Sequence, residues 1–251
     1  MENKKKLLYT CMLFNKLVNI RLKIVLRKYL FYIYLIIMLD EIKYVCLADI
    51  KYVCSFGTLC HAAQIFKNNK LKLCSYPFDW IFSNHNNIIH CIENDFNIFL
   101  DKSYYVNLGY NRCGHSYYNQ NMFFNHHNPA TNENDYNYYI RCVNRFRNLC
   151  KSNEHKLFLM IYINLDYIDK NEKNNIIDFN NKLSKFINNY TLLVIFQLHN
   201  KHINKHNFTY IDNIHFLELH TLSSSTGVVF INNTDNEYIN DIIMTTYNFI
   251  I

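Results

Sequence analysis

The chain has very little glycine and proline: its 251 residues include only four glycines and two prolines. Phosphate-binding loops need glycines at fixed spacing, and neither GxGxxG nor GxxxxGKS/T occurs in the sequence. The GxSxG turn that carries the nucleophile of many serine hydrolases is absent as well. These absences exclude the common nucleotide-binding loops and the most familiar serine nucleophile.

The sequence also lacks an apolar run long enough to cross a membrane. A spanning helix needs about 20 apolar residues, whereas the longest uninterrupted run, YLFYIYLIIML, covers residues 29–39. It could span only if Arg27 and Lys28 turned their charges to the membrane surface. We therefore expect residues 1–40 to form a basic and apolar helical extension beside a domain at 41–251. Membrane contact through residues 7–39 is not expected.

Positive charge is scarce outside the beginning of the chain. The net charge is +6, and most of the excess lies before position 30, so the remainder is close to neutral. A nucleic-acid-binding protein needs a basic stripe on its folded domain. No nucleic-acid partner is therefore expected.

Paired cysteine motifs are missing, although nine cysteines are present. The cysteines are scattered and form no CxxC pair, which favours free, mostly buried thiols in a reducing compartment such as the cytoplasm. Cys113, His115, His126 and His127 supply four atoms of the kind that bind zinc. Their spacing matches no strong zinc pattern, so we expect neither a metal nor a cofactor.

Apolar segments do alternate with amphipathic ones along most of the chain. Half of the residues are hydrophobic, which is enough for a sizeable core. Helical spacing occurs at 59–69, 87–100, 135–150, 174–190 and 236–251. Buried strands are expected at 50–54, 156–163 and 191–199, with one or two more at 208–220. The pattern predicts a single α/β or α+β domain whose mostly parallel central sheet is flanked by helices.

Two segments fit this pattern less clearly. The motif IKYVC occurs at 42–46 and again at 50–54, and the first copy is either a neighbouring strand or a local duplication. Residues 103–134 are polar and read as long loops with short strands, including NMFFNHH. The serine-rich segment 223–227 is expected to be a turn, and a loop near a functional site is the alternative.

The stretch IKYVCSFGTLCHAAQIF, residues 50–66, poses a choice between two thiols. Cys54 lies inside an apolar strand, where burial raises the pKa of a thiol and suppresses its reactivity. Cys60 lies near a helix start, where free amides and the helix dipole can lower a thiol pKa. Cys60 is therefore the candidate nucleophile. The alternative is that it is a small core residue at the start of a helix.

A nucleophilic cysteine needs a base, usually histidine, and a group that orients the base. His126 and His127 follow a short strand-like run, and His199, His215 and His220 each end an apolar stretch. Asp79, in PFDW, lies between bulky apolar residues and must have a partner for its charge. That partner is either a catalytic histidine or the backbone amides of a turn.

The segment from SFGTLC through PFDW resembles the opening of a family of putative papain-like cysteine peptidases, a domain of unknown function found in bacteria and large DNA viruses. The downstream elements FNH at 124–126, DYNYYIRCVNRFRNL at 135–149 and KLFLMIYI at 156–163 continue the similarity. It covers residues 50–165 well and the last third of the chain loosely. The composition, rich in Asn, Ile, Lys, Tyr and Phe, also suits the AT-rich genome of such a virus or of a low-GC microbe.

The resemblance implies a cysteine peptidase, or a related hydrolase or acyltransferase, that acts on a peptide or another carbonyl compound. It assigns Cys60 as the nucleophile and His126 as the best-matched base, with His127 as the alternative. Asp79 or Asp135 would be the third member. A non-catalytic interaction or structural domain is the competing hypothesis. A glycan-active enzyme that uses Asp79 with Asp95 is a weaker one.

Overall fold

The computed structural model describes residues 49–251. The predicted extension at 1–40, its boundary and the first IKYVC copy lie outside these residues. Within them, no helix combines the length and the apolar character needed to cross a membrane.

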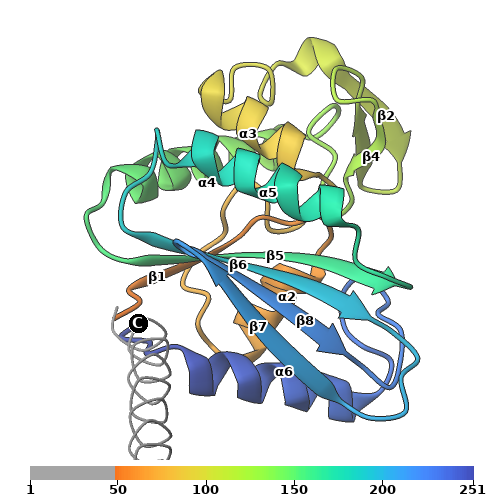
Figure 1. Cartoon of the computed structure of the whole chain (residues 1–251). Helices are drawn as coiled ribbons and strands as arrows, with labels where there is room; N and C mark the ends of the chain where they lie inside the picture. The colour runs from red at the N-terminus through yellow and green to blue at the C-terminus, as the bar shows by residue number, and fades with distance from the viewer. Residues whose placement is uncertain (1–48) are drawn as a thin grey trace, which may run out of the picture. The chain divides into compact units, whose positions relative to one another are not determined.

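A five-stranded sheet forms the centre of the domain, and four of its strands are parallel (Figure 1). The strand order is β1-β5-β6-β8-β7, with β7 antiparallel at one edge. In chain order these strands are β1 (Tyr52–Ser55), β5 (Lys156–Leu165), β6 (Tyr190–Leu198), β7 (Lys205–Ile211) and β8 (Ile214–His220). The predicted α/β class and mostly parallel sheet are confirmed.

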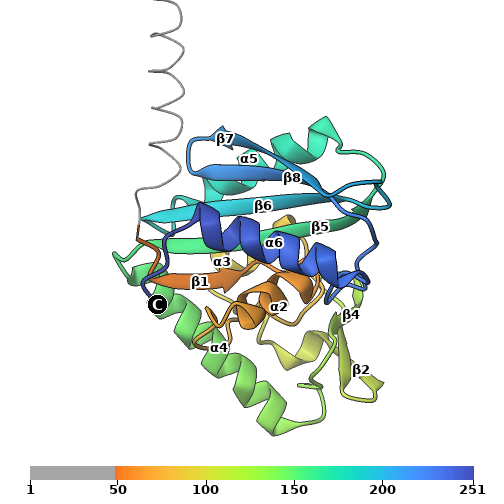
Figure 2. The same cartoon turned by 90° about the horizontal axis from the view of Figure 1, so that it is seen from below.

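Helices cover both faces of this sheet, as Figures 1 and 2 show from two directions. One face carries α3 (His85–Glu93), α4 (Glu133–Lys151) and α5 (Lys170–Leu183). The other carries α2 (His61–Asn68) and α6 (Asn233–Thr246). Side chains alternate between the two faces along each strand, so Phe158 and Met160 join the core on the first face and Leu157 and Leu159 the core on the second.

A small antiparallel sheet occupies the region predicted as long loops with short strands. Its strands are β2 (Tyr105–Gly109), β3 (Arg112–His115) and β4 (Gln120–Phe124), preceded by a 3-10 turn, η1 (Lys102–Tyr104). The PFDW segment runs beside β4: Ile81 forms a bridge with Phe124, and Phe82 N–H donates to Phe123 O at 2.9 Å. This contact brings the end of β4 close to the end of β1.

Most predicted elements are present, and the differences lie at their ends. Asn84 caps α3 by accepting from Asn87 N–H, and Asp169 caps α5 by accepting from Asn171 N–H, so both helices begin earlier than predicted. The segment 208–220 is a hairpin, because the chain turns at Asp212 and Asn213 between β7 and β8.

The two ends of the described chain meet at the amino end of β1. Ile50 pairs with Phe249 in a parallel bridge. Ile50 N–H donates to Asn248 O at 2.8 Å, and Ile250 N–H donates to Ile50 O at 3.0 Å. The last residues thus close the domain beside its first strand.

Candidate functional site

Cys60 lies just beyond the carboxyl end of β1, where the chain turns sharply into α2. Gly57 makes this turn, and a Cβ built on it would lie 2.4 Å from Phe78 O and 2.9 Å from Leu59 O. Real Cβ atoms do not approach backbone oxygens so closely, so only glycine fits here. Ser83 Oγ donates to Gly57 O, and Thr58 Oγ1 donates to Ile161 O, which fixes the turn to its neighbours.

Cys60 is the N-cap residue of α2, and its side chain makes no capping hydrogen bond. The α3, α4, α5 and α6 helices are capped by Asn or Asp, which accept from first-turn amides. Such a cap is worth about 1 kcal/mol over a residue that cannot accept. In α2 the first-turn amides therefore lack a side-chain cap from Cys60.

His126 contacts Cys60 across 66 positions of sequence. Its Nε2 lies 3.5 Å from Cys60 Sγ, within hydrogen-bond distance for sulfur, and 3.5 Å from the Asn125 amide nitrogen. Both contacts suit an unprotonated Nε2 that accepts. The ring of Trp80, from the PFDW segment, stands edge-on to the imidazole at 6.2 Å. The structure thus brings together the two residues that the sequence assigned as nucleophile and base.

Burial controls the charge state of this pair. Cys60 is only 1% exposed, and this burial raises the pKa of its thiol to about 11. Burial also lowers the pKa of His126, and the nearby His127 and Arg112 lower it further. The lowered thiol pKa expected from the helix start is therefore outweighed by burial. At neutral pH the pair consists of a thiol and a neutral imidazole.

Cys54 is a core residue. It is 1% exposed, packs in the core on the α3–α5 face, and has its thiol pKa raised well above the ordinary value by burial. This agrees with its placement inside an apolar strand.

Asp79 holds the turn of the PFDW segment. Its Oδ2 accepts from Tyr76 N–H at 2.8 Å and pairs with Lys72, and its Oδ1 accepts from Ser55 Oγ at 2.7 Å. The sequence left two kinds of partner open for Asp79, a catalytic histidine or the backbone amides of a turn. The contact with Tyr76 N–H is of the second kind, and none of these contacts is with a histidine. Asp79 fastens the turn that carries Trp80 to the end of β1.

Asp135 pairs with His127 instead of His126. The Nδ1–H of His127 donates to Asp135 Oδ1 at 2.9 Å, and Asn128 N–H donates to the other carboxylate oxygen at 2.8 Å. The His127 ring stacks on Tyr138 of α4 at 4.3 Å. The two adjacent histidines therefore have different contacts: His126 faces the thiol, and His127 anchors the loop to α4.

A polar network joins the serine-rich segment 223–227 to the residue that follows Cys60. Ser225 Oγ is 2.8 Å from Nδ1 of His61, the residue after Cys60. Asn164, at the carboxyl end of β5, donates to Ser225 O at 2.9 Å and accepts from Ser225 N–H at 2.7 Å. Asn164 adopts a left-handed φ of +57°, and its N–H donates to Gln197 Oε1 at 2.6 Å. Asparagine adopts this conformation more readily than most other non-glycine residues.

One signal in the sequence could have found this network. In parallel sheets, ligands bind at the carboxyl ends of the strands. Asn164 follows the buried run of β5 in the same way that Cys60 follows β1.

The remaining candidates are held in separate places. Cys113 Sγ donates to Gly114 O and His115 Nε2 donates to Ile98 O, so the four zinc candidates have different partners. Among residues 49–251, no group of three or more His, Cys, Asp or Glu side chains could hold a metal ion. Asp95 pairs with Arg147 at 2.8 Å, whereas Asp79 pairs with Lys72, and this gives no support for a carboxylate pair.

One family model matches the described domain. The model of the family described as "Putative papain-like cysteine peptidase" matches residues 51–202, more than half of the chain. The chain belongs to this family. The match confirms the resemblance and includes both Cys60 and His126, while the loop with Ser225 and helix α6 lie beyond it. No curated protein and no solved structure matches the chain.

Proposed function

We propose that this member of the papain-like cysteine peptidase family is a cysteine-nucleophile hydrolase or acyltransferase that uses Cys60 and His126. The contact of 3.5 Å between Cys60 Sγ and His126 Nε2 is the observation that supports it. A buried thiol needs no imidazole partner for packing, whereas a nucleophile needs a base within hydrogen-bond reach.

In the proposed reaction, His126 Nε2 takes the proton from Cys60 as the sulfur attacks a carbonyl carbon. The negative charge on the carbonyl oxygen would be stabilised by the uncapped first-turn amides of α2. The imidazolium then gives its proton to the leaving amine, the C–N bond breaks, and a thioester remains on Cys60. Water, deprotonated by His126, hydrolyses the thioester, or another amine takes the acyl group.

Neither Asp79 nor Asp135 has a hydrogen bond to His126 in the described part of the chain. We therefore assign the chemistry to a Cys–His pair and give both carboxylates positioning roles. Asp135 would act through His127 on the loop that carries His126. Asp79 would act through the turn that carries Trp80.

The proposed substrate is a peptide or another amide, and no nucleic acid is part of the reaction. Every cysteine from residue 49 onward is a free thiol, which supports a reducing compartment such as the cytoplasm.

One observation favours the non-catalytic alternative, namely that Cys60 is only 1% exposed. Substrate would have to reach the sulfur past His126, the exposed member of the pair.

Labelling with a panel of peptide vinyl sulfones tests the proposal, because these electrophiles require a positioned thiol and a proton donor. We expect mass spectrometry to find the label on Cys60, with none on a Cys60→Ala variant and full labelling of a Cys54→Ala variant. The same Cys60→Ala variant should fail to hydrolyse any peptide in a broad substrate panel. Labelling spread over several cysteines and independent of His126 would favour the non-catalytic domain.

A further inference from the structure

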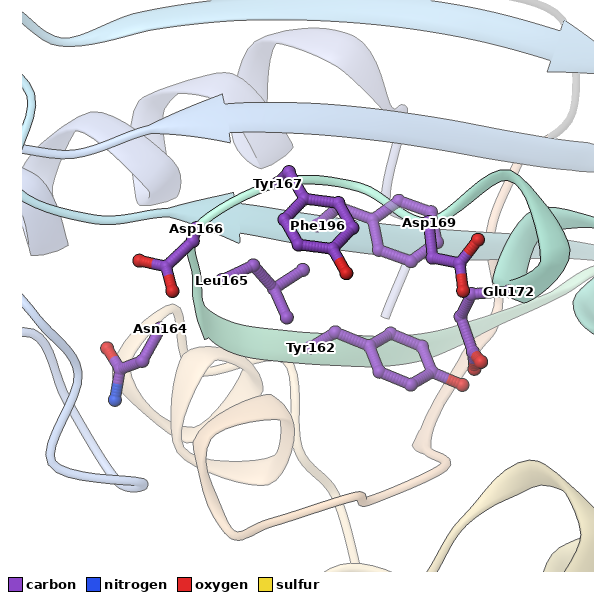
Figure 3. Close-up of a pocket in the computed structure, with 8 residues that line it drawn as sticks. All are labelled: Tyr162, Asn164, Leu165, Asp166, Tyr167, Asp169, Glu172 and Phe196. Atoms are coloured by element: carbon purple, nitrogen blue, oxygen red, sulfur yellow. The ribbon is translucent and has the colours of Figure 1, made fainter.

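A pocket of about 410 Å³ opens at the carboxyl ends of β5 and β6, where α5 begins (Figure 3). Its size is within the range of small-molecule and side-chain sites. Three aromatic and three acidic residues dominate its lining: Tyr162, Tyr167, Phe196, Asp166, Asp169 and Glu172. No lysine or arginine is among the residues that line it.

Aromatic rings form one wall of this pocket. Tyr162 and Phe196 stack with their centroids 5.3 Å apart, while Tyr167 is 75% exposed at the rim. The same row of rings attracts a cation elsewhere, since Lys173 Nζ stands 5.6 Å from the ring of Phe216, which stacks on Phe196. Aromatic faces attract cations through their quadrupole, and arginine is the commonest partner in proteins.

Carboxylates face these rings. In Figure 3 the carboxylates of Asp169 and Glu172 stand at the same end of the pocket as the hydroxyl of Tyr162, and Asp166 stands at the opposite end. Within residues 49–251, the salt-bridge partner of Glu172 is His85, at 3.3 Å. Because burial lowers the pKa of His85, its imidazole is neutral near pH 7 and leaves the charge of Glu172 uncompensated.

The pocket and the thiol lie on the same edge of the sheet. Tyr162 OH is 3.2 Å from His85 Nδ1, and His85 is two residues after Ser83, which donates to the carbonyl of Gly57. Asn164 lines the pocket and is linked through Ser225 to His61, the neighbour of Cys60. A chain bound across this edge could therefore contact both places.

We propose that this pocket binds the guanidinium group of an arginine side chain in the substrate. Phe196 is covered by its stacking with Tyr162 and Phe216, so the exposed ring of Tyr167 is the face open to a ligand. A planar guanidinium can stack on Tyr167 while its N–H groups donate to Asp169 and Glu172. The inference rests on the proposed function in one respect: the arginine belongs to the molecule that Cys60 attacks. Binding of the side chain itself requires no chemistry.

The test measures binding of Nα-acetyl-arginine amide to the full chain by NMR titration, with Nα-acetyl-citrulline amide as the neutral probe of the same shape. We expect the arginine probe to bind at least about tenfold more tightly than the citrulline probe. The double variant Glu172→Gln with Asp169→Asn should remove this preference, because both carboxylates are lost. An asparagine at position 169 can still cap α5, so the helix should remain folded. Asp178→Asn, an exposed change on α5 away from the pocket, is the matched control and should keep it.

Equal binding of the two probes, or no binding of either, would overturn the arginine assignment. The same titration on Cys60→Ala separates this result from the proposed function, because binding needs no thiol. Arginine-selective binding together with failed vinyl sulfone labelling would leave the pocket and reject the nucleophile. Successful labelling of Cys60 with no preference for the arginine probe would support the nucleophile and reject the arginine pocket.

Discussion

His127 donates from Nδ1 to Asp135 at 2.9 Å, while the preceding residue, His126, contacts the sulfur of Cys60 at 3.5 Å. The two neighbouring histidines thus have opposite surroundings, one facing a thiol and the other a carboxylate. The carboxylate also accepts from Asn128 N–H, so it fixes both the ring and the backbone of the loop after β4. This arrangement separates a base from the pair that positions it.

Substitution of the two histidines should therefore have unequal effects. We expect His126→Ala to slow vinyl sulfone labelling of Cys60 by roughly 100-fold or more, because the base is lost. His127→Ala should slow it by about tenfold, since a displaced loop misplaces the base. His127→Asn, whose amide can still donate to Asp135, should restore most of the rate. Equal losses in the two alanine variants, both still folded, would identify His127 as a second essential group.

The reaction of Cys60 with iodoacetamide should depend steeply on pH. Only the thiolate reacts, and burial raises the pKa of Cys60 to about 11. The thiolate fraction is then small at neutral pH and grows about tenfold for each pH unit below that value. Rates measured by mass spectrometry from about pH 5 to about pH 10 should rise without a plateau. A plateau already present at pH 6 would mean a preformed thiolate–imidazolium pair, contrary to the burial described above.

Gly57→Ala should destabilise the domain more than a second glycine substitution does. The new methyl would meet two backbone oxygens at 2.4 and 2.9 Å, and overpacking of this kind costs about 2 kcal/mol or more. Gly109→Ala is the control, because that glycine has a φ of +73° but nothing within 4 Å of its Cβ position. Only the backbone cost of about 1 kcal/mol applies there. Urea unfolding of both variants measures the difference, and similar losses would disprove the close contact.

Asp79→Ala should act on stability before it acts on chemistry. The substitution leaves Lys72 without its partner in a site where the lysine side chain is only 12% exposed. Loss of one member of a buried ion pair costs about 3 kcal/mol. We expect a lower urea midpoint, and labelling of Cys60 slowed by less than about tenfold in the protein that stays folded, because Asp79 acts on the site only through the turn that carries Trp80. A large loss of labelling with unchanged stability would instead make Asp79 part of the catalytic group.

The fold was largely predictable because its strands are continuous apolar runs and its helices have clear stripes. The stripe from Tyr139 to Leu149 is buried as expected. The ends of helices were harder, since Asn84 and Asp169 act as caps only through backbone geometry that composition does not reveal. The burial of a residue at a junction could not be predicted either, and the pKa of Cys60 follows from it.

The candidate site was predictable where it depends on local order and unpredictable where it depends on long-range contacts. Cys60 could be chosen from the strand–glycine–helix sequence around it. The division of roles between His126 and His127 required the position of α4, which brings Asp135 to only one of them. The Asn164–Ser225 link joins residues 61 positions apart. The apolar run before Asn164 marks that residue, but no local pattern predicts its contact with Ser225.

The bridge between Ile50 and Phe249 makes this domain suitable for circular permutation. Because the first and last described strand-edge residues are hydrogen-bonded, a short linker could join them without crossing the domain. New ends could then be opened at the hairpin turn of Asp212 and Asn213, between β7 and β8, where both residues are exposed or half-buried. Such a circular permutant would keep every strand of the sheet and the contact between Cys60 and His126.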